Sequence, residues 1–195
     1  MANNQGRRPW RNALSIGTGT FFLALLLGYA TQSFIGHLGS LAVSFILLLV
    51  IILTGIAFDI LGIAVAAAAE PPLHARAARK VPGAKEAIWL LRNADRVASF
   101  ANDVVGDVCG TLSGAIGASI LFRLAGSKSA ENVALGTVVT AVIAALTVGG
   151  KALGKSFALR EAEDIVFWAG RLLAFVENIR HKPLANNGPR KGRAK

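Results

Sequence analysis

The sequence predicts an all-α membrane protein with four transmembrane helices and amphipathic helices at the cytoplasmic face of the membrane. Three observations predict this class. Of the 195 residues, 53% are hydrophobic and only 16% are charged, whereas soluble domains carry about 25% charged residues. The basic residues cluster at both ends and in one segment between apolar runs, the pattern of positively charged cytoplasmic loops. Apolar runs close to the roughly 20 residues that a spanning helix needs lie near 13–33, 41–69, 104–125 and 132–150.

These runs predict one transmembrane domain, 13–181, between a basic N-terminal segment, 1–12, and a basic tail, 182–195, which we expect to be disordered. The first run comes after "GRRPWRN" and ends near "GYA". A cleaved signal peptide is therefore the competing interpretation of this run. Its length, and the apolar character of the chain beyond it, favour a span.

The loops predict the topology. The connection "SFIGHLGS" has no Lys or Arg, whereas 70–100 has six, so both termini and 70–100 are predicted to be cytoplasmic. Arg123 and Lys128 then face outward and are an exception. The net charge of +10 is explained by this topology without nucleic acid. We expect a multi-pass protein of the cell (plasma) membrane, with membrane lipid as a partner and no nucleic acid.

Two segments are predicted to lie along the inner membrane surface. In 72–101, prolines interrupt the chain and apolar residues recur near helical spacing, which predicts one or two short interfacial helices. In 157–181, apolar residues recur at i, i+3 and i+4 with charges on the other face. This segment predicts an amphipathic helix that is too charged to span.

The sequence does not predict an enzyme. Cys109 is the single cysteine, and the three histidines have no zinc or haem spacing. The polar residues supply no Ser/His/Asp set, and the "GTGT" at 17–20 has no lysine after it. We expect no catalytic residue and no cofactor, with Mg²⁺ or Na⁺ considered only as a transported ion.

Charged residues inside the apolar runs predict a functional site instead. An aspartate within a membrane costs about 2.5 to 3.5 kcal/mol, so Asp59 should face protein or water. Lys151 shares a helix face with Thr140, Ala144 and Thr147. Under the predicted topology the charges lie at similar depths in the cytoplasmic half of the membrane. The predicted polar pocket consists of Asp59, Asn102, Asp103, Asp107 and Lys151, with Asp59 and Asp107 as candidate metal ligands.

Lys151 has an alternative interpretation as an interfacial residue whose stem is buried while its ammonium reaches the headgroups. We expect this behaviour of Lys155. Glycines at 149, 150 and 154 surround Lys151 and are expected to weaken the helix there. A second glycine row, with spacings that let another helix approach closely, is formed by Gly106, Gly110, Gly114 and Gly117.

The segment "GKALGKSFALREAED" (150–164) is similar to the G-E-x-x-P-K-S-x-A pattern of the CNNM/CorC family of magnesium and divalent-cation exporters. "GAKEAIWLLRNADRVASF" and "FDILGIAVAAAAEPPLHARA" resemble two further stretches of that family's transmembrane domain. The resemblance covers about 50–180, lacks the family's CBS domains, and implies a dimer with a cation pocket. Lys151 stands where the family has its pocket glutamate, and Asp59, Gly62 and Asp107 also replace pocket residues.

Two functions therefore remain open. In the first, the protein transports an ion or proton, and Lys151 is a tethered cation whose proton exchanges for a metal or sodium ion. In the second, the protein is a non-transporting scaffold whose pocket is plugged by an ion pair between Lys151 and Asp59 or Asp107. A separation below about 4 Å between the ammonium and a carboxylate indicates a plug or a switch. The family resemblance and the glycine row favour a homodimer.

Overall fold

The computed structural model describes residues 9–38, 40–125 and 133–180, and their regular structure is helical. The predicted fold class is confirmed, because four long apolar stretches have the length and composition of membrane-spanning helices. The elements in chain order are α1 (Pro9–Leu38), α2 (Leu41–Ala67), α3 (Glu70–Ala78), α4 (Ala84–Arg92), α5 (Ala94–Ser99), the π-helix η1 (Phe100–Gly106), α6 (Asp107–Ala125), α7 (Val133–Arg160) and α8 (Ala162–Arg180).

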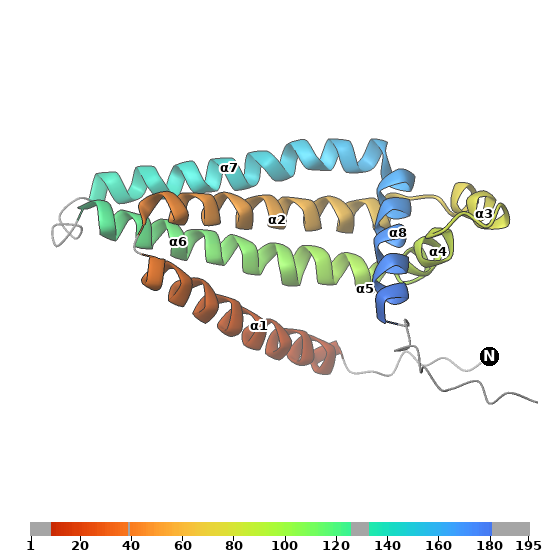
Figure 1. Ribbon diagram of the computed structural model, residues 1–195, viewed down its shortest axis with the longest axis horizontal. Coiled ribbons are helices and arrows are strands. Elements are labelled where there is room, and N and C mark those ends of the chain that lie inside the picture. Colours follow the sequence, from red (N-terminus) through yellow and green to blue (C-terminus); the bar gives the residue numbers. More distant parts are fainter. Residues whose placement is uncertain (1–8, 39, 126–132, 181–195) are drawn as a thin grey trace, which may run out of the picture.

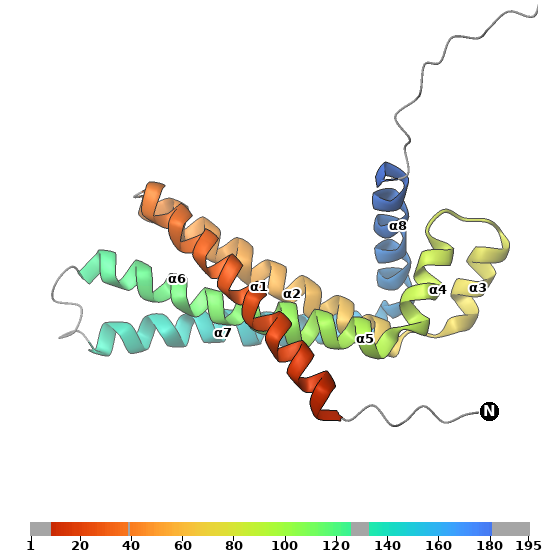
Figure 2. The same cartoon turned by 90° about the horizontal axis from the view of Figure 1, so that it is seen from below.

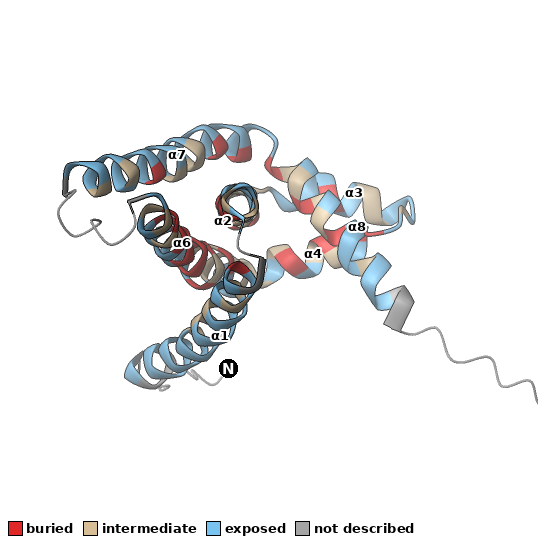
Figure 3. Cartoon of the chain, turned by 60° about the vertical axis from the view of Figure 1, so that its left-hand side comes forward, coloured by how far each residue is buried: buried red, intermediate tan, exposed pale blue. Residues whose placement is uncertain are grey.

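The bundle is built around α2, which packs against both α6 and α7 (Figure 1). Aliphatic side chains from the spans interlock in the half of the bundle farther from α8. Buried residues face inward from α6, whereas α1 and much of α7 are exposed (Figure 3). In a membrane these exposed apolar surfaces face lipid. The buried members of this core are Ile35, Leu48, Ile52, Ile116, Ile120 and Ile143.

The third span starts earlier than the sequence predicts. The expected start at 104 moves back to Ala94, because α5, η1 and α6 form one helical stretch, Ala94–Leu124. Asp95 and Arg96 interrupt the apolar pattern there but do not interrupt the helix. The end of the interfacial segment predicted at 72–101 thus belongs to a candidate span, and α3 and α4 make up the rest of that segment.

The fourth span is also longer than predicted. The expected end near 150 is wrong, because α7 continues to Arg160 and the chain bends at Glu161 before α8 begins. The expectation that glycines weaken the helix around Lys151 is not met. A Cβ at Gly150 would clash with Ile56, and one at Gly154 would lie 2.7 Å from Cγ1 of Ile60. These glycines let α7 lie close against α2.

The helix α8 runs across one end of the bundle, nearly perpendicular to the spans, beside α3 and α4 (Figure 1). Glycines bring α4 and α8 into backbone contact. Gly83, with φ of 90°, lies against the Arg171 backbone, and a Cβ at Gly170 would lie 2.5 Å from the backbone nitrogen of Ala87. A second core cluster joins these helices to α2 and α7: Ala64, Val65, Leu73, Ala87, Leu90, Ala158, Ala162 and Val166.

The helix α1 crosses the bundle obliquely, and its N-terminal half diverges from the other spans (Figure 2). None of the residues in its most apolar window is buried. Its contacts lie in the C-terminal half, where Gly28 faces Leu112 and Gln32 bonds Ser119. The predicted tail, 182–195, most of the N-terminal segment and Lys128 lie outside the described residues.

Candidate functional site

An ion pair in the interior of the spans joins two of the predicted pocket residues. The Nζ of Lys151 lies 3.6 Å from the Oδ1 of Asp59. The two side chains are 27% and 16% exposed, respectively. At a rise of 1.5 Å per residue, Lys151 lies about 13 Å of helix from Arg160, and Asp59 lies about 12 Å from Ala67. The pair is therefore well inside both helices, and Lys151 is a partner of Asp59.

Glycines set the distance between the helices that carry this pair. Gly150 and Gly154 bring α7 against α2 on either side of Lys151. On α2, a Cβ at Gly55 would lie 2.9 Å from the Cβ of Cys109, so α6 also approaches closely. A Cβ at Gly106 would lie 3.4 Å from the ammonium of Lys151. The site thus lies where α2, α7 and the end of η1 meet.

Asn102 of η1 also lies at this contact between the helices. A Cβ at Gly62 would overlap the Oδ1 of Asn102, so the amide lies directly over this glycine, three residues beyond Asp59. The Oδ1 atom is buried and has no hydrogen-bond partner among the described residues. A buried acceptor without a partner is uncommon and costs about 1 to 3 kcal/mol. Asn102 thus places a buried, unsatisfied acceptor oxygen against α2, one helical turn beyond Asp59.

The other two predicted acids are placed differently. The side chains of Asp103 and Asp107 are exposed. Asp103 accepts a hydrogen bond of 2.7 Å from the hydroxyl of Ser99. Within the part of the chain that the structure describes, neither acid forms an ion pair. The expected convergence of all four charges is thus limited to Asp59 and Lys151.

The glycine row is split in the same way. Gly106 faces Lys151, and Gly117 packs against Ile143 of α7. A Cβ at Gly110 or Gly114 would meet nothing within 4 Å. Only the two ends of the row therefore mediate packing within this chain.

The π-helix accounts for part of this arrangement. In a π-helix each N–H bonds the carbonyl five residues earlier, so one turn holds more residues than an α-helical turn. Residues four apart across η1 do not share a face as they would in an α-helix. Gly106, its last residue, is buried, while Asp107 directly after it is exposed. The sequence predicts an α-helix in this segment, so residue faces based on α-helical spacing do not hold across η1.

The structure does not assemble the predicted metal ligands into a recognisable centre. Among the described residues there is no group of three or more His, Cys, Asp or Glu side chains that could hold a metal ion. Asp59 instead has the Lys151 ammonium as its cationic neighbour. Any cation that binds Asp59 must therefore compete with Lys151.

Comparison of the chain with models of protein families, with curated proteins and with solved structures finds no match. The geometry of the site is therefore the basis on which a function can be argued.

Proposed function

We propose that this multi-pass membrane protein transports a cation, and that Lys151 is the tethered cation that closes its binding pocket. The observation that carries the proposal is the 3.6 Å separation between Lys151 Nζ and Asp59 Oδ1 inside the spans. Ionisable groups at such depth are costly and usually mark ion or proton pathways. The partial exposure of both side chains leaves the pair accessible for exchange.

The exchange follows from the chemistry of the two groups. When Lys151 is an ammonium, it neutralises Asp59 and no further cation is needed. If the ammonium releases one proton, a monovalent cation can take its place on the carboxylate with no change in net charge. The neighbouring Oδ1 of Asn102, which is buried and unpartnered among the described residues, supplies a second oxygen. The resemblance, which is to exporters of divalent cations, supports a cation as the substrate but not its single charge.

Flux in reconstituted vesicles tests this function. Full-length protein in liposomes that contain a trapped pH indicator is given an external gradient of Na⁺, Mg²⁺ or Mn²⁺. We expect one of these ions to drive counterflow of protons, so that the lumen becomes more alkaline. Asp59→Asn and Lys151→Met should each abolish the signal, whereas Lys155→Met, which changes an exposed lysine, should retain it. No flux above empty liposomes for any of the three ions contradicts the proposal.

A scaffold without transport is the second candidate, and the same ion pair favours it. A pair closer than 4 Å plugs the pocket permanently if the ammonium never leaves. In that case Lys151 contributes only stability, since its removal leaves a carboxylate uncompensated inside the spans. The scaffold predicts no flux together with a strong loss of stability in Lys151→Met. Absence of flux in the wild-type protein together with full stability of Lys151→Met contradicts both candidates.

We also propose that two copies associate through the outer face of α6. One face of α6 supports this association. Asp107 is exposed on it, and a Cβ at Gly110 or Gly114 would meet no other atom within 4 Å. A carboxylate that faces lipid is costly, and small residues permit close helix approach. Disulfide crosslinking of Cys109→Ala/Thr111→Cys should give a covalent dimer in membranes. Cys109→Ala/Ala145→Cys, on the exposed face of α7, should not.

The position of α8 supports the membrane arrangement of the spans. Large apolar side chains of α8 remain exposed, with Trp168 at 58%, Leu172 at 67% and Phe175 at 64%. The guanidinium of Arg171 lies 5.3 Å from the centroid of the Trp168 ring. A helix with an apolar face and cationic flanks, perpendicular to the spans, has the character of an interfacial helix. We therefore place α8 at the cytoplasmic surface of the plasma membrane.

A further inference from the structure

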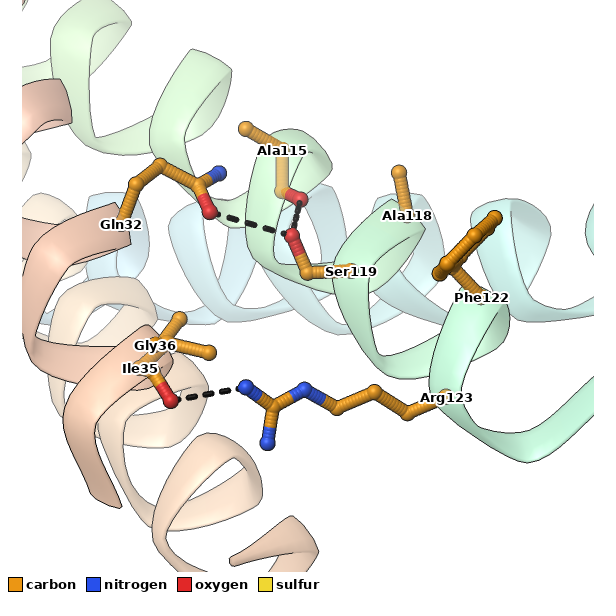
Figure 4. A pocket seen from close by; sticks show the side chains of 8 residues that line it. All are labelled: Gln32, Ile35, Gly36, Ala115, Ala118, Ser119, Phe122 and Arg123. Carbon is orange, nitrogen blue, oxygen red and sulfur yellow. Dashed lines mark hydrogen bonds between the residues drawn. The ribbon is translucent and has the colours of Figure 1, made fainter. Parts of the chain in front are cut away.

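A groove lies between α1 and α6, at the end of the bundle opposite α8 (Figure 1). It has a volume of about 540 Å³. Its polar lining comes from Gln32, Ser119 and Arg123, and its apolar lining comes mainly from Ala115, Ala118 and Phe122 (Figure 4). The groove is remote from the Asp59–Lys151 pair. Its lining on α6 begins at Ala115, more than two helical turns beyond Gly106, which faces Lys151.

Two hydrogen bonds hold its walls together. The hydroxyl of Ser119 shares its one proton between the carbonyl oxygen of Ala115, at 3.0 Å, and Oε1 of Gln32, at 3.3 Å. Nη2 of Arg123 donates to the carbonyl of Ile35 at 2.7 Å. The Ile35 carbonyl belongs to the last turn of α1, whose carbonyls have no helical N–H partners. Arg123 therefore caps α1 from a different helix, and its charge complements the negative end of the α1 dipole. This contact gives a structural reason for a cation at the outward end of the third span.

The remaining polar groups of Gln32 and Arg123 are donors. A guanidinium has five N–H donors and no acceptor, and the bond to Ile35 uses one amino group. With its oxygen turned toward the Ser119 hydroxyl, the Gln32 amide presents its NH₂ group. A ligand in this groove should therefore bring acceptor oxygens and a negative charge, because charge-assisted bonds to guanidinium are the strongest available there.

The apolar part of the groove suits a hydrocarbon chain. Ala115 and Ala118 are small and leave a shallow shelf along α6, and Phe122 beside them is 66% exposed. This shelf opens at the side of the bundle, where the acyl chains of a bilayer lie. A free anion would satisfy Arg123 but would leave the shelf uncovered.

We propose that this groove binds a phospholipid with an anionic headgroup, whose phosphate contacts Arg123 and whose acyl chain covers Ala115 and Ala118. The site is independent of the transport proposal, because no residue of the ion pair takes part. Lipid binding can fail while cation flux persists, and the reverse is also true.

Lipid titration by native mass spectrometry of the delipidated full-length protein tests the proposal. The probes are phosphatidylglycerol and phosphatidylcholine with the same acyl chains. We expect the wild-type protein to bind phosphatidylglycerol about tenfold more tightly, because both lipids carry a phosphate but the choline ammonium of phosphatidylcholine offsets its attraction to Arg123. Arg123→Gln should abolish this preference, and Arg123→Lys should retain part of it.

Arg123→Gln also removes the cap of α1, so a second variant is needed. Ala118→Leu fills the shelf and leaves both hydrogen bonds in place, and it should weaken phosphatidylglycerol binding about tenfold. Ala145→Leu, a matched change on the exposed face of α7, should have no effect. Equal affinities of these two variants for phosphatidylglycerol contradict a lipid site in this groove. Displacement of phosphatidylglycerol by millimolar glycerol phosphate or inorganic phosphate contradicts a lipid as the ligand and identifies a free anion instead.

Discussion

The Lys151 ammonium lies 3.6 Å from the Asp59 carboxylate, and neither residue is near an end of its helix. The stem of Lys151 does not carry its charge to the surface at the end of α7, as an interfacial lysine would. Gly150 and Gly154 instead bring α7 so close to α2 that the carboxylate is the nearest ionic partner. Close helix packing and charge pairing thus depend on the same short segment of α7.

Removal of Lys151 should destabilise the protein. Lys151→Met leaves Asp59 uncompensated, which costs 3 to 5 kcal/mol in fully buried pairs and about 2 kcal/mol in this partly exposed one. We expect the Tm in detergent to fall by roughly 4 to 8 °C. Asp59→Leu/Lys151→Met should recover at least half of the loss, since neither charge is then left alone. Lys155→Met is the control and should leave the Tm unchanged.

Gly62→Ala should also destabilise the site, because its Cβ would overlap the amide of Asn102. We expect a loss of about 1 to 3 kcal/mol, as in other overpacked positions, measured as a decrease in Tm. Asn102→Ala removes both the clash and the unpartnered oxygen. The double variant should therefore be more stable than Gly62→Ala alone. A double variant as unstable as the single one would show that the contact with Asn102 is not the cause.

The contact between α4 and α8 should depend on Gly170. A Cβ at this position would lie 2.5 Å from the Ala87 nitrogen and from the Gly83 carbonyl oxygen, and backbone atoms cannot move aside as side chains do. Gly170→Ala should lower the Tm through a loss of about 1 to 3 kcal/mol and increase tryptic cleavage near Arg171. Gly149→Ala has open space around it and should be neutral or stabilising, since alanine favours the helix over glycine by about 1 kcal/mol.

The fluorescence of Trp168 should report an interfacial position of α8. In Trp10→Phe/Trp89→Phe, Trp168 is the single tryptophan. Brominated lipids should quench it most strongly when the bromines lie near the headgroup end of the acyl chain. A tryptophan at the exposed Phe22 of α1, with the other three replaced, should be quenched best by deeper bromines. Equal depth profiles for the two positions contradict an interfacial α8.

The sequence was sufficient to predict four apolar spans, and Asp59 or Asp107 as the partner of Lys151, because both predictions depend on properties that run along the chain. Apolar runs predict where a helix can cross a membrane, and shared depth in the predicted topology brought Asp59 and Lys151 together. The π-helix was not predicted, since its residues do not differ in pattern from an α-helix. Its wider turn removes the α-helical alignment of residues four apart, such as Asp103 and Asp107.

Contacts between distant helices were also beyond the sequence. Gly150 and Gly154 have the spacing of a packing motif, but their partners, Ile56 and Ile60, are known only once α2 and α7 are placed together. Arg123 is an exception to the charge pattern of the sequence, and its hydrogen bond to the Ile35 carbonyl explains it. In both cases the missing information was the identity of the neighbour.

The attachment of α1 has a consequence for biogenesis. Its hydrogen-bond partners, Ser119 and Arg123, lie 87 and 88 positions downstream of Gln32 and Ile35. The ribosome therefore completes this first helix long before the residues that will fasten it exist. During that interval α1 lacks both bonds, and its apolar surface, exposed on nearly every side, suits it to lie in lipid with few protein contacts.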